Sequence, residues 1–457
     1  MKKILLIIFL GAFFYPKAQM QLLKIAPNKR CFVTADGKPF FWLGDTGWLL
    51  FVKTKREQAI QYLDDRKAKG YNVIQVMVVH DLDLGVNVYG DSALHNKDVS
   101  QPITTPGKNF AKAAEYDFWD NVDFVIDEAA KRGIYMALVP VWGGNIKRVS
   151  VKQATDYASF LAKRYRNKTN IIWLNGGDIK GGDALDKWNA IGKTLRTIDK
   201  NHLITFHPRG RNSSSEWFHN ASWLDFNMFQ SGHRSYAQDT SANEKLHYGE
   251  DNWRYVNYDY KLKPTKPTLD GEPSYEDIPY GLHDGKEPYW QDYEIRRYAY
   301  WSVFAGACGF TYGHNSVMQY YTPGDSGISF FPKIIWQDGL AAPGAGQMQY
   351  LKKLMLSKSY FDRVPDQSMI VDNGEKYDRI LATRGKDYAL IYTYTGRNFK
   401  VKMGKIEGKK VMVSLLNPRT GVLSKYNLFD NTGVIDIKLS GEAKPGNDWV
   451  FVFQKFR

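Results

Sequence analysis

Residues 54–79, TKREQAIQYLDDRKAKGYNVIQVMVV, contain one helix and the strand that follows it. Residues 54–57 have the pattern of a capping box, in which Thr54 and Glu57 accept hydrogen bonds from N–H groups that the first turn of a helix leaves free. We expect this helix to extend to Lys69, because Gly70 favours a helix end. Residues 72–79 are almost all apolar, which is typical of a parallel strand buried on both faces.

The same alternation of helix and strand continues on both sides of this unit. The sequence predicts strands over residues 40–43, 72–79, 134–141, 171–174, 203–206, 224–228, 267–269 and 309–312. It predicts helices over residues 54–69, 117–132, 150–165, 183–199, 293–305 and 347–358. A second capping box begins the helix at Ser150, whereas the helix after the fifth strand has no clear signal. Eight strands alternating with helices favour parallel pairing, and right-handed crossovers then allow a closed (β/α)8 TIM barrel of the α/β class.

The alternative architecture is an open, doubly wound sheet. That fold would carry a glycine-rich phosphate loop after its first strand. Residues 44–47, GDTG, do not have this pattern, so we favour the closed barrel.

Two smaller regions flank the predicted barrel. Extended runs at 30–34 and 39–44 are separated by the sequence ADGK, and Asp-Gly between such runs predicts a β-hairpin. After Lys358 the helical pattern stops, and short β-forming runs separated by turn residues predict a small antiparallel β-sandwich. The predicted domains are therefore a barrel with its N-terminal β-hairpin over residues 19–358 and a β-sandwich over residues 359–457.

The first residues have the pattern of an export signal. Lys2 and Lys3 precede an apolar run over residues 4–14, and the small residue Ala18 follows. We expect a signal peptide over residues 1–18, so that the mature protein is secreted or periplasmic. The apolar run is too short to span a bilayer stably, and we expect no stable membrane insertion.

The formal net charge is +14, and the Lys and Arg residues are scattered along the chain. A nucleic-acid site would group them with stacking aromatic residues, so we expect no nucleic-acid partner. For an exported protein, an acidic polysaccharide or oligosaccharide is the more natural partner of a basic surface.

Cysteine and histidine spacing bears on metal chemistry. Cys31 and Cys308 are the only cysteines, and they could either pair or remain as buried thiols. Neither a zinc-type spacing nor a His-Glu-x-x-His motif occurs, which argues against a metalloprotease. We expect no metal and no cofactor.

Reactive side chains follow nearly every predicted strand. In a (β/α)8 barrel the active site lies at the carboxyl ends of the strands. In chain order, the candidates there are Asp45, Trp48, His80, Asp81, Trp142, Asn175, Asp178, His207, Gln230, His233, Asp270, Glu272, Tyr275, Tyr312 and His314. Carboxylates, imidazoles and tryptophans without metal-ligand spacing suit cleavage of a glycosidic bond. That reaction needs one protonated carboxyl group and one ionised carboxylate.

Several of these candidates have an alternative interpretation. The Gly-Gly-Asp sequence at 176–178 could be only a turn, but its Asp ends a strongly apolar strand, which favours a catalytic role. Asp270 competes with Glu272, because strand alternation would place both on one face. We interpret Asp45 together with Trp48 as a clamp for sugar hydroxyls, and the histidines as side chains that line the pocket.

Longer motifs carry a specific resemblance. They are FWLGDTGW at 41–48, YLDDR at 62–66, GYNVIQ at 70–75, IWLNGGD at 172–178, FHP at 206–208, DFNM at 225–228, QSGH at 230–233 and DGEP at 270–273. Together they resemble the apiosidase-like barrel hydrolases, glycoside hydrolase family 140. The sequences NPRTG at 417–421 and DWV at 448–450 are similar to the small C-terminal domain often attached to that family and labelled collagen-binding.

The resemblance implies a retaining mechanism, with Asp178 as acid/base and Glu272 as nucleophile. It also implies cleavage of apiose linkages in pectic side chains, notably of rhamnogalacturonan II. Asn175 stands where the family often has an aliphatic residue. Two alternatives stay open: a carbohydrate- or matrix-binding barrel without catalysis, and a glycosidase for another sugar, such as an arabinofuranoside or a galactoside.

Overall fold

The computed structural model describes residues 20–239 and 247–456. The predicted signal peptide lies outside the described residues. Within the described part of the chain, no helix combines the length and the apolar character that crossing a membrane requires.

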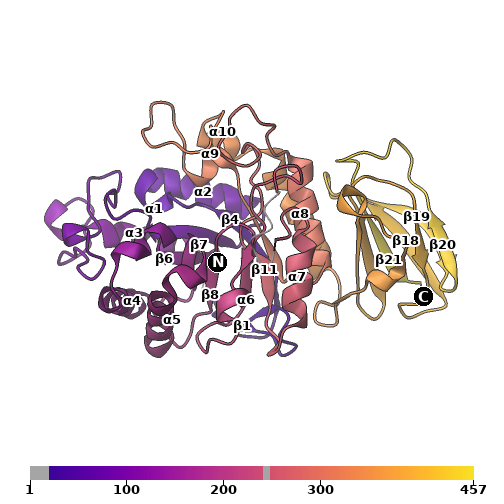
Figure 1. The fold of residues 1–457 in the computed structure, drawn as a ribbon, viewed down its shortest axis with the longest axis horizontal. Coiled ribbons are helices and arrows are strands. Elements are labelled where there is room, and N and C mark those ends of the chain that lie inside the picture. Colours follow the sequence, from indigo (N-terminus) through magenta and orange to yellow (C-terminus); the bar gives the residue numbers. More distant parts are fainter. Residues whose placement is uncertain (1–19, 240–246, 457) are drawn as a thin grey trace, which may run out of the picture.

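Eight parallel strands form the larger domain, as predicted (Figure 1). They are β4 (Trp42–Thr46), β5 (Val73–Val79), β6 (Tyr135–Val141), β7 (Ile171–Ile179), β8 (Ile204–Pro208), β10 (Asn227–Gln230), β11 (Thr268–Asp270) and β12 (Gly309–Tyr312). β12 pairs with β4, which joins the last of these strands to the first. The barrel closes between β8 and the segment that leads into β10, where the Asp225 N–H group donates to the Ile204 carbonyl at 2.9 Å. The two-residue strand β9 (Asn212–Ser213) adds an antiparallel pair to β10. The predicted (β/α)8 barrel is confirmed.

Helices surround this barrel. The longer ones are α2 (Arg56–Ala68), α3 (Phe118–Lys131), α4 (Val151–Tyr165), α5 (Leu185–Ile198), α7 (Asn252–Lys261), α8 (Asp292–Phe304) and α11 (Pro343–Leu356). The helix after the fifth strand is only the single turn α6 (Ser215–Phe218). Helix α7 was not predicted. Two of its four buried residues are the polar Asn252 and Asp259, so its buried face lacks the apolar periodicity by which helices are recognised.

The two predicted capping boxes have different outcomes. Ser150 accepts from the Gln153 N–H group, and Gln153 accepts from the Ser150 N–H group, so the second box is confirmed. The first prediction is wrong, because the short helix α1 (Leu50–Lys53) precedes α2 and the Thr54 hydroxyl donates to the Leu50 carbonyl at 2.7 Å. The Lys55 N–H group instead donates to the side chain of Gln58 at the start of α2.

The flanking regions also form sheets. The N-terminal hairpin is present as β2 (Phe32–Thr34) and β3 (Pro39–Phe40), with β1 (Leu23–Ile25) added at its edge. The C-terminal domain has a sheet of β13 (Val364–Pro365), β15 (Ile380–Arg384), β16 (Tyr388–Thr393), β21 (Trp449–Lys455), β18 (Lys410–Leu416) and β19 (Leu423–Asp430). A second sheet consists of β14 (Ile370–Val371), β17 (Phe399–Lys402) and β20 (Val434–Ile437). All pairs are antiparallel, and both sheets contribute to one apolar core. Cys31 and Cys308 are both buried and free.

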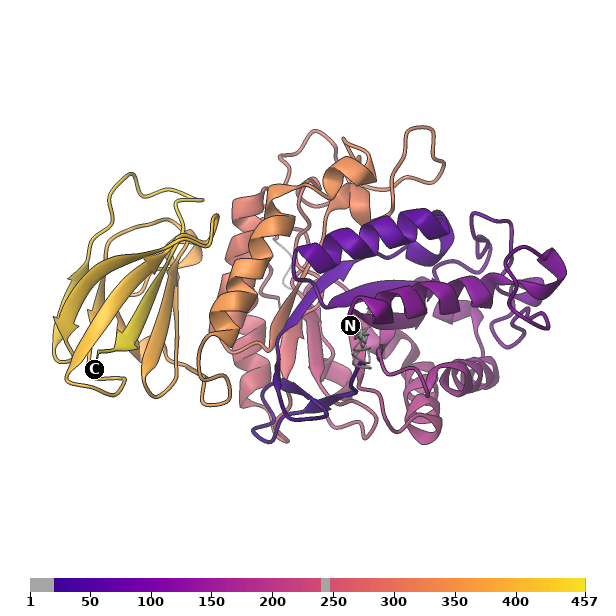
Figure 2. The same cartoon turned by 180° about the vertical axis from the view of Figure 1, so that it is seen from behind.

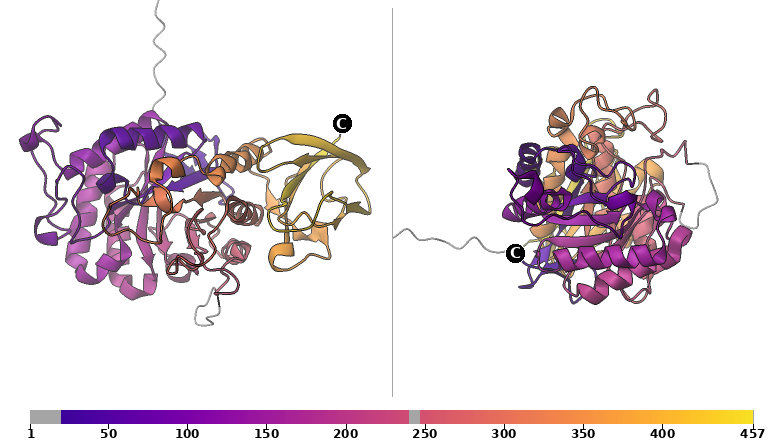
Figure 3. Two further views of the ribbon diagram at one scale, coloured as in Figure 1. Left: turned by 90° about the horizontal axis from the view of Figure 1, so that it is seen from above. Right: turned by 90° about the vertical axis from the view of Figure 1, so that its left-hand side faces the viewer.

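Helices α8 and α11 lie between the barrel and the C-terminal domain (Figures 1 and 2). The C-terminal domain extends from one end of the molecule (Figure 3). Every residue of α8 from Glu294 to Phe304 is buried, because the barrel covers one side of the helix and the C-terminal domain covers the other. Tyr300 of α8 stacks on Tyr392 of β16 with ring centroids 4.7 Å apart.

Asp45 is part of a buried ion pair inside the barrel domain. Its carboxylate contacts the guanidinium of Arg66 and accepts from the Tyr62 hydroxyl at 2.7 Å. Arg66 and Tyr62 lie one turn apart on α2, and the side chains of Asp45 and Arg66 are both 0% exposed. The predicted contact of Asp45 with sugar hydroxyls is therefore not supported, because the carboxylate faces α2 and not the open end of the barrel.

This pair gives a stability prediction. Arg66→Leu leaves the Asp45 carboxylate buried without its partner, and we expect the free energy of unfolding to fall by about 3–5 kcal/mol. Arg148→Leu is the matched control, because Arg148 pairs with Asp83 with side chains 49% and 46% exposed, and an exposed pair contributes about 1 kcal/mol or less. Guanidinium unfolding followed by circular dichroism measures both, and equal losses in the two variants would contradict the prediction.

Candidate active site

A cavity of about 940 Å³ opens at the carboxyl ends of the barrel strands. Its size is that of a typical small-molecule site. Nine of the residues predicted from the strand ends line it: Trp48, His80, Asp81, Trp142, Asp178, Gln230, His233, Glu272 and Tyr275. The side chains of Asp45, Asn175, His207, Asp270, Tyr312 and His314 lie behind this wall.

The end of β7 has an unusual backbone. Gly176, Gly177 and Asp178 have φ values of 96°, 108° and 47°, all in the left-handed region. A Cβ atom on Gly176 would lie 2.6 Å from the His207 carbonyl oxygen, and one on Gly177 would lie 2.6 Å from the Trp142 ring, so only glycine fits at either position. The pairing of β7 with β8 is interrupted at this point. As a result Asp178 turns out of the strand and is its one exposed residue, facing the cavity.

The left-handed backbone conformation of Asp178 costs conformational free energy that a glycine at this position would not lose. A non-glycine residue in this region is strained by about 1–2 kcal/mol, and such strain concentrates at functional sites. The N–H group of Asp178 points toward Nδ1 of His207 at 3.4 Å. The strand end is thus tied to the neighbouring strand β8 at the residue that faces the cavity.

Two histidines hold Glu272. Nε2 of His233 lies 3.2 Å from its Oε1 atom, and Nε2 of His207 lies 3.2 Å from its Oε2 atom. Burial by itself would raise the pKa of Glu272, but the hydrogen bonds and charges of the two histidines outweigh burial and lower this pKa to about 2. Glu272 is therefore ionised over nearly the whole pH range.

Asp178 has the opposite electrostatic environment. Surrounding protein atoms raise its pKa most, the negative charge of Glu272 raises it further, and His207, His233 and Arg209 oppose this only in part. The resulting pKa is about 6. Between about pH 2 and pH 6 one carboxyl group of the cavity is protonated while the other is ionised.

Aromatic side chains form one wall of the cavity. The rings of Trp48 and Trp142 lie 5.3 Å apart, and the Trp48 indole N–H group donates to the Tyr275 hydroxyl at 2.9 Å. Tyr275 in turn lies beside Glu272, whose charge contributes to the raised pKa of this tyrosine after burial. Flat, rigid side chains of this kind suit the apolar face of a sugar ring.

Several buried polar atoms of the wall have no hydrogen-bond partner within the described residues. Oε1 of Gln230 and Nδ1 of His80 are among them. Burial also lowers the pKa of His80, so its neutral form is favoured. Buried polar atoms usually have partners, and a substrate hydroxyl could supply one here.

Three of the predicted residues behind the wall bond to neighbouring segments of the barrel domain. Asn175 donates to the Trp188 carbonyl at 2.8 Å, Tyr312 donates to Glu276 at 2.6 Å, and His314 accepts from the Ser316 N–H group as the N-cap of α9 (Asn315–Met318). Their placement does not support the predicted direct contact with substrate.

Asp270 is turned toward α7 and not toward Glu272. It accepts from the Ser231 hydroxyl at 2.7 Å and from the Asn252 amide at 3.1 Å. Strand alternation led us to expect both carboxylates on one face, but β11 ends at Asp270, so the alternation does not extend to Glu272.

Basic and apolar residues of the cavity were not predicted. Lys147, Arg209, Arg211 and Arg234 line it, as do the apolar residues Leu84, Val86 and Phe330. Arg209 and Arg211 directly follow β8, so the rule that active sites lie at strand ends could have found them. Lys147 lies in the 3-10 helix Gly143–Arg148 after β6, and the others lie in loops whose course the sequence pattern does not give. The described residues contain no group of three or more His, Cys, Asp or Glu side chains that could hold a metal ion.

The comparisons with known proteins agree with this geometry. A family model described as "Apiosidase-like, catalytic domain" matches residues 26–362, and one described as "Putative collagen-binding domain of a collagenase" matches residues 364–454. None of the curated proteins compared with the chain matches it.

Solved structures give the same result. A structure titled "Glycoside hydrolase" is 45% identical with a TM-score of 0.89, covering 95% of this chain and 97% of its own. A glycoside hydrolase family 5 structure from Bacteroides vulgatus ATCC 8482 is 42% identical with a TM-score of 0.89, covering 96% of this chain and 94% of its own. An endo-1,4-beta-D-mannanase from Thermotoga petrophila RKU-1 shares the fold alone, at 14% identity and a TM-score of 0.50, over 69% of this chain and 100% of its own.

The family model covers most of the chain, and two solved glycoside hydrolases match nearly all of it at more than 40% identity. The protein is a glycoside hydrolase that belongs to the apiosidase-like family.

Proposed function

We propose that this glycoside hydrolase is a retaining enzyme that releases apiose-type residues from acidic pectic side chains, with Asp178 as acid/base and Glu272 as nucleophile. The observation that carries the proposal is the opposite protonation of two carboxyl groups in one cavity, Asp178 with a pKa of about 6 and Glu272 with a pKa of about 2. This is the pairing that glycosidic cleavage needs.

The proposed reaction has two steps. Protonated Asp178 donates its proton to the glycosidic oxygen while ionised Glu272 attacks the anomeric carbon, so that the leaving alcohol departs and a glycosyl ester forms on Glu272. Ionised Asp178 then takes a proton from a water molecule, whose oxygen attacks the anomeric carbon and releases Glu272. His207 and His233 stabilise Glu272 as the carboxylate that attacks first and leaves last.

The proposal of an acidic substrate rests on the charges around the cavity. Six Lys or Arg side chains line it, against four Asp or Glu side chains. Arg209 and Arg234 are in positions from which a guanidinium could bind a carboxylate of a uronic acid. A pectic substrate would be met outside the cell, so we also propose that the enzyme is exported by its predicted signal peptide.

Removal of either carboxyl group tests the catalytic assignment. We expect Asp178→Ala and Glu272→Ala to lower kcat by roughly 10²–10⁴-fold or more, because each removes a group that acts on the reacting atoms. Apiose released from rhamnogalacturonan II, measured by chromatography, gives the rate, and aryl arabinofuranosides and galactosides test other sugars. Asp186→Ala, at an exposed position on α5, is the control. Full activity in either folded variant would refute the assignment.

The pH dependence follows from the two pKa values. We expect kcat/KM to rise through about pH 2 as Glu272 ionises and to fall as the pH rises through about 6, where Asp178 loses the proton that it must donate. Glu272 contributes to the raised pKa of Asp178, so the pKa of Asp178 should fall in Glu272→Gln. A titration of Asp178 by carboxyl infrared difference spectra measures this shift, and an unchanged pKa would contradict the proposed coupling.

The charge preference can be tested at Arg209. We expect Arg209→Met to raise KM roughly tenfold for an oligosaccharide with free uronic acids, and to leave KM for its carboxyl-reduced form nearly unchanged. The same variant should move the alkaline limb of the pH profile upward, because Arg209 lowers the pKa of Asp178. Lys163→Met, on the exposed face of α4, is the control. Equal effects on both substrates would argue against carboxylate recognition.

A further inference from the structure

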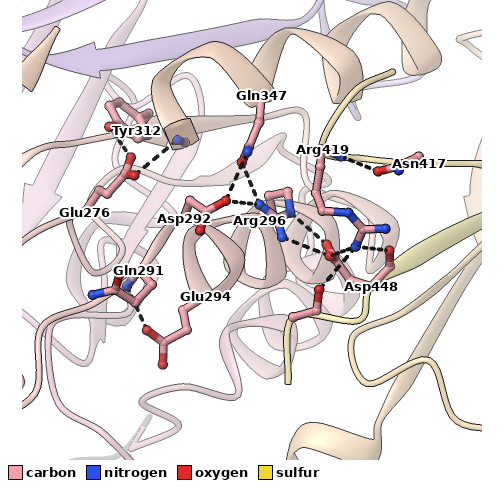
Figure 4. A network of polar contacts seen from close by, with 12 residues as sticks. Glu276, Gln291, Asp292, Glu294, Arg296, Tyr312, Gln347, Asn417, Arg419 and Asp448 are labelled. Atoms are coloured by element: carbon pink, nitrogen blue, oxygen red, sulfur yellow. Dashed lines mark hydrogen bonds and ion pairs between the residues drawn. The ribbon is translucent and has the colours of Figure 1, made fainter. Parts of the chain in front are cut away.

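A buried ion pair fixes the C-terminal domain to the barrel. Arg296 of α8 contacts both carboxylate oxygens of Asp448 at 2.9 Å, and Asp448 is fully buried just before β21 (Figure 4). Arg419 and Tyr392, both of the C-terminal domain, also donate to Asp448, at 2.9 and 3.1 Å. Such two-point contacts fix orientation as well as distance, so the two domains have one defined arrangement.

The next residue of α8 forms a second buried pair. A guanidinium nitrogen of Arg297 lies 2.5 Å from Oε2 of Glu250, and both side chains are 0% exposed. Two aromatic rings of the C-terminal domain, Tyr377 and Tyr394, lie 4.9 and 5.1 Å from this guanidinium. Removing two charges from water is costly, and the rings and the carboxylate compensate the arginine here.

Tyr377 also contacts the carboxylate partner directly. Its hydroxyl donates to Glu250, with both carboxylate oxygens within reach at 3.1 and 3.2 Å. Tyr377 belongs to the short turn Lys376–Asp378, which projects from the C-terminal domain onto the barrel. Through this hydroxyl, the C-terminal domain thus donates a hydrogen bond to a carboxylate of the barrel domain.

Glu250 holds the loop that follows β10. Its Oε1 atom accepts from the Tyr236 N–H group at 2.6 Å, and the rings of Tyr236 and Tyr377 lie 5.2 Å apart. Glu250 is therefore one of the anchors of segment 231–239, beside the hydrogen bonds of the Tyr236 hydroxyl to Asp251 and of Ser231 to Asp270, and the Tyr236 ring adds a contact with the C-terminal domain. Three residues before Tyr236 in this segment is His233, which contacts Glu272.

Other contacts of this segment lead to α8 and to the connection that precedes it. The Ser274 hydroxyl lies 2.9 Å from the Gly232 carbonyl and 3.2 Å from the hydroxyl of Tyr298, the residue after Arg297. The His233 carbonyl accepts from the Gly281 N–H group and from the Trp290 indole. His233 is thus held on one side by the β11–α8 connection and on the other through Tyr236 and Glu250.

We infer that Tyr377 of the C-terminal domain is a positioning residue for the active site: its hydroxyl holds Glu250, which anchors segment 231–239 and keeps His233 against Glu272. The importance of this contact for catalysis rests on the proposed function, in which Glu272 is the nucleophile. The structural part of the inference, the dependence of segment 231–239 on Tyr377, does not rest on it.

Hydrogen exchange of the full-length protein tests the structural part. We expect Tyr377→Phe to speed amide exchange roughly tenfold in peptides covering 231–239, while peptides covering β6 stay unchanged. Tyr426→Phe is the matched control, because it removes a tyrosine hydroxyl that bonds within the C-terminal domain, to Lys438. Unchanged exchange in 231–239, or equal acceleration in the control, would overturn the inference whatever the activity.

The pH profile tests the catalytic part. Loss of the His233 contact raises the pKa of Glu272, so we expect the acidic limb of kcat/KM to move upward by about one unit in Tyr377→Phe. It should move in the same direction and further in His233→Ala, and stay in place in Tyr426→Phe. Faster exchange with an unmoved acidic limb would restrict Tyr377 to a structural role and overturn the positioning claim. If Glu272→Ala kept full activity, the proposed function would fail instead, and the exchange result would stand separately.

Discussion

The proposed active site depends on keeping two carboxyl groups of one cavity in different protonation states. Two carboxylates near each other repel, and the surrounding protein disfavours the charge of each, so without further groups the pKa of both would be raised. His207 and His233 resolve this by contacting the two oxygens of Glu272 separately. Among the described residues Asp178 has no such pair of contacts, and it takes up the proton because the surrounding protein disfavours its charged form and the negative charge of Glu272 adds to this effect. The geometry of β8 and of the loop after β10, which carry the two histidines, therefore determines the roles that the proposed mechanism gives to Asp178 and Glu272.

The backbone of β7 adapts to the same requirement. In a regular strand, the backbone could not pass so close to His207 and Trp142 and also direct the side chain of residue 178 into the cavity. Gly176 and Gly177 allow the approach because a side chain at either position would overlap a neighbouring atom at 2.6 Å. Asp178 then adopts a left-handed conformation that the surrounding barrel must stabilise.

The sequence predicted the features that local pattern determines. The eight barrel strands, the N-terminal hairpin, the capping box at Ser150 and the position of Asp178 and Glu272 at strand ends follow from apolar runs, turn residues and the barrel rule. It did not predict contacts between polar groups far apart in the chain. Asp45 resembled a site residue, yet Arg66 neutralises it inside the barrel domain, and α7 was missed because its buried Asn252 and Asp259 are satisfied by distant partners. In a sequence, a polar residue that is buried in an ion pair cannot be distinguished from a catalytic residue until its partner in the fold is known.

The same limitation hid the relation between the two domains. A tail of short strands after a barrel suggests an independent module, and two separate family models match the two parts. Helix α8 contradicts independence, because it is buried on all sides and has consecutive arginines with different partners, Asp448 in one domain and Glu250 in the other. An isolated barrel would expose the apolar face of α8 and the Arg297–Glu250 pair to water, which would weaken both the packing and the ion pair. Since Glu250 anchors the loop of His233, the C-terminal domain is better regarded as part of the catalytic unit than as an appended binding module.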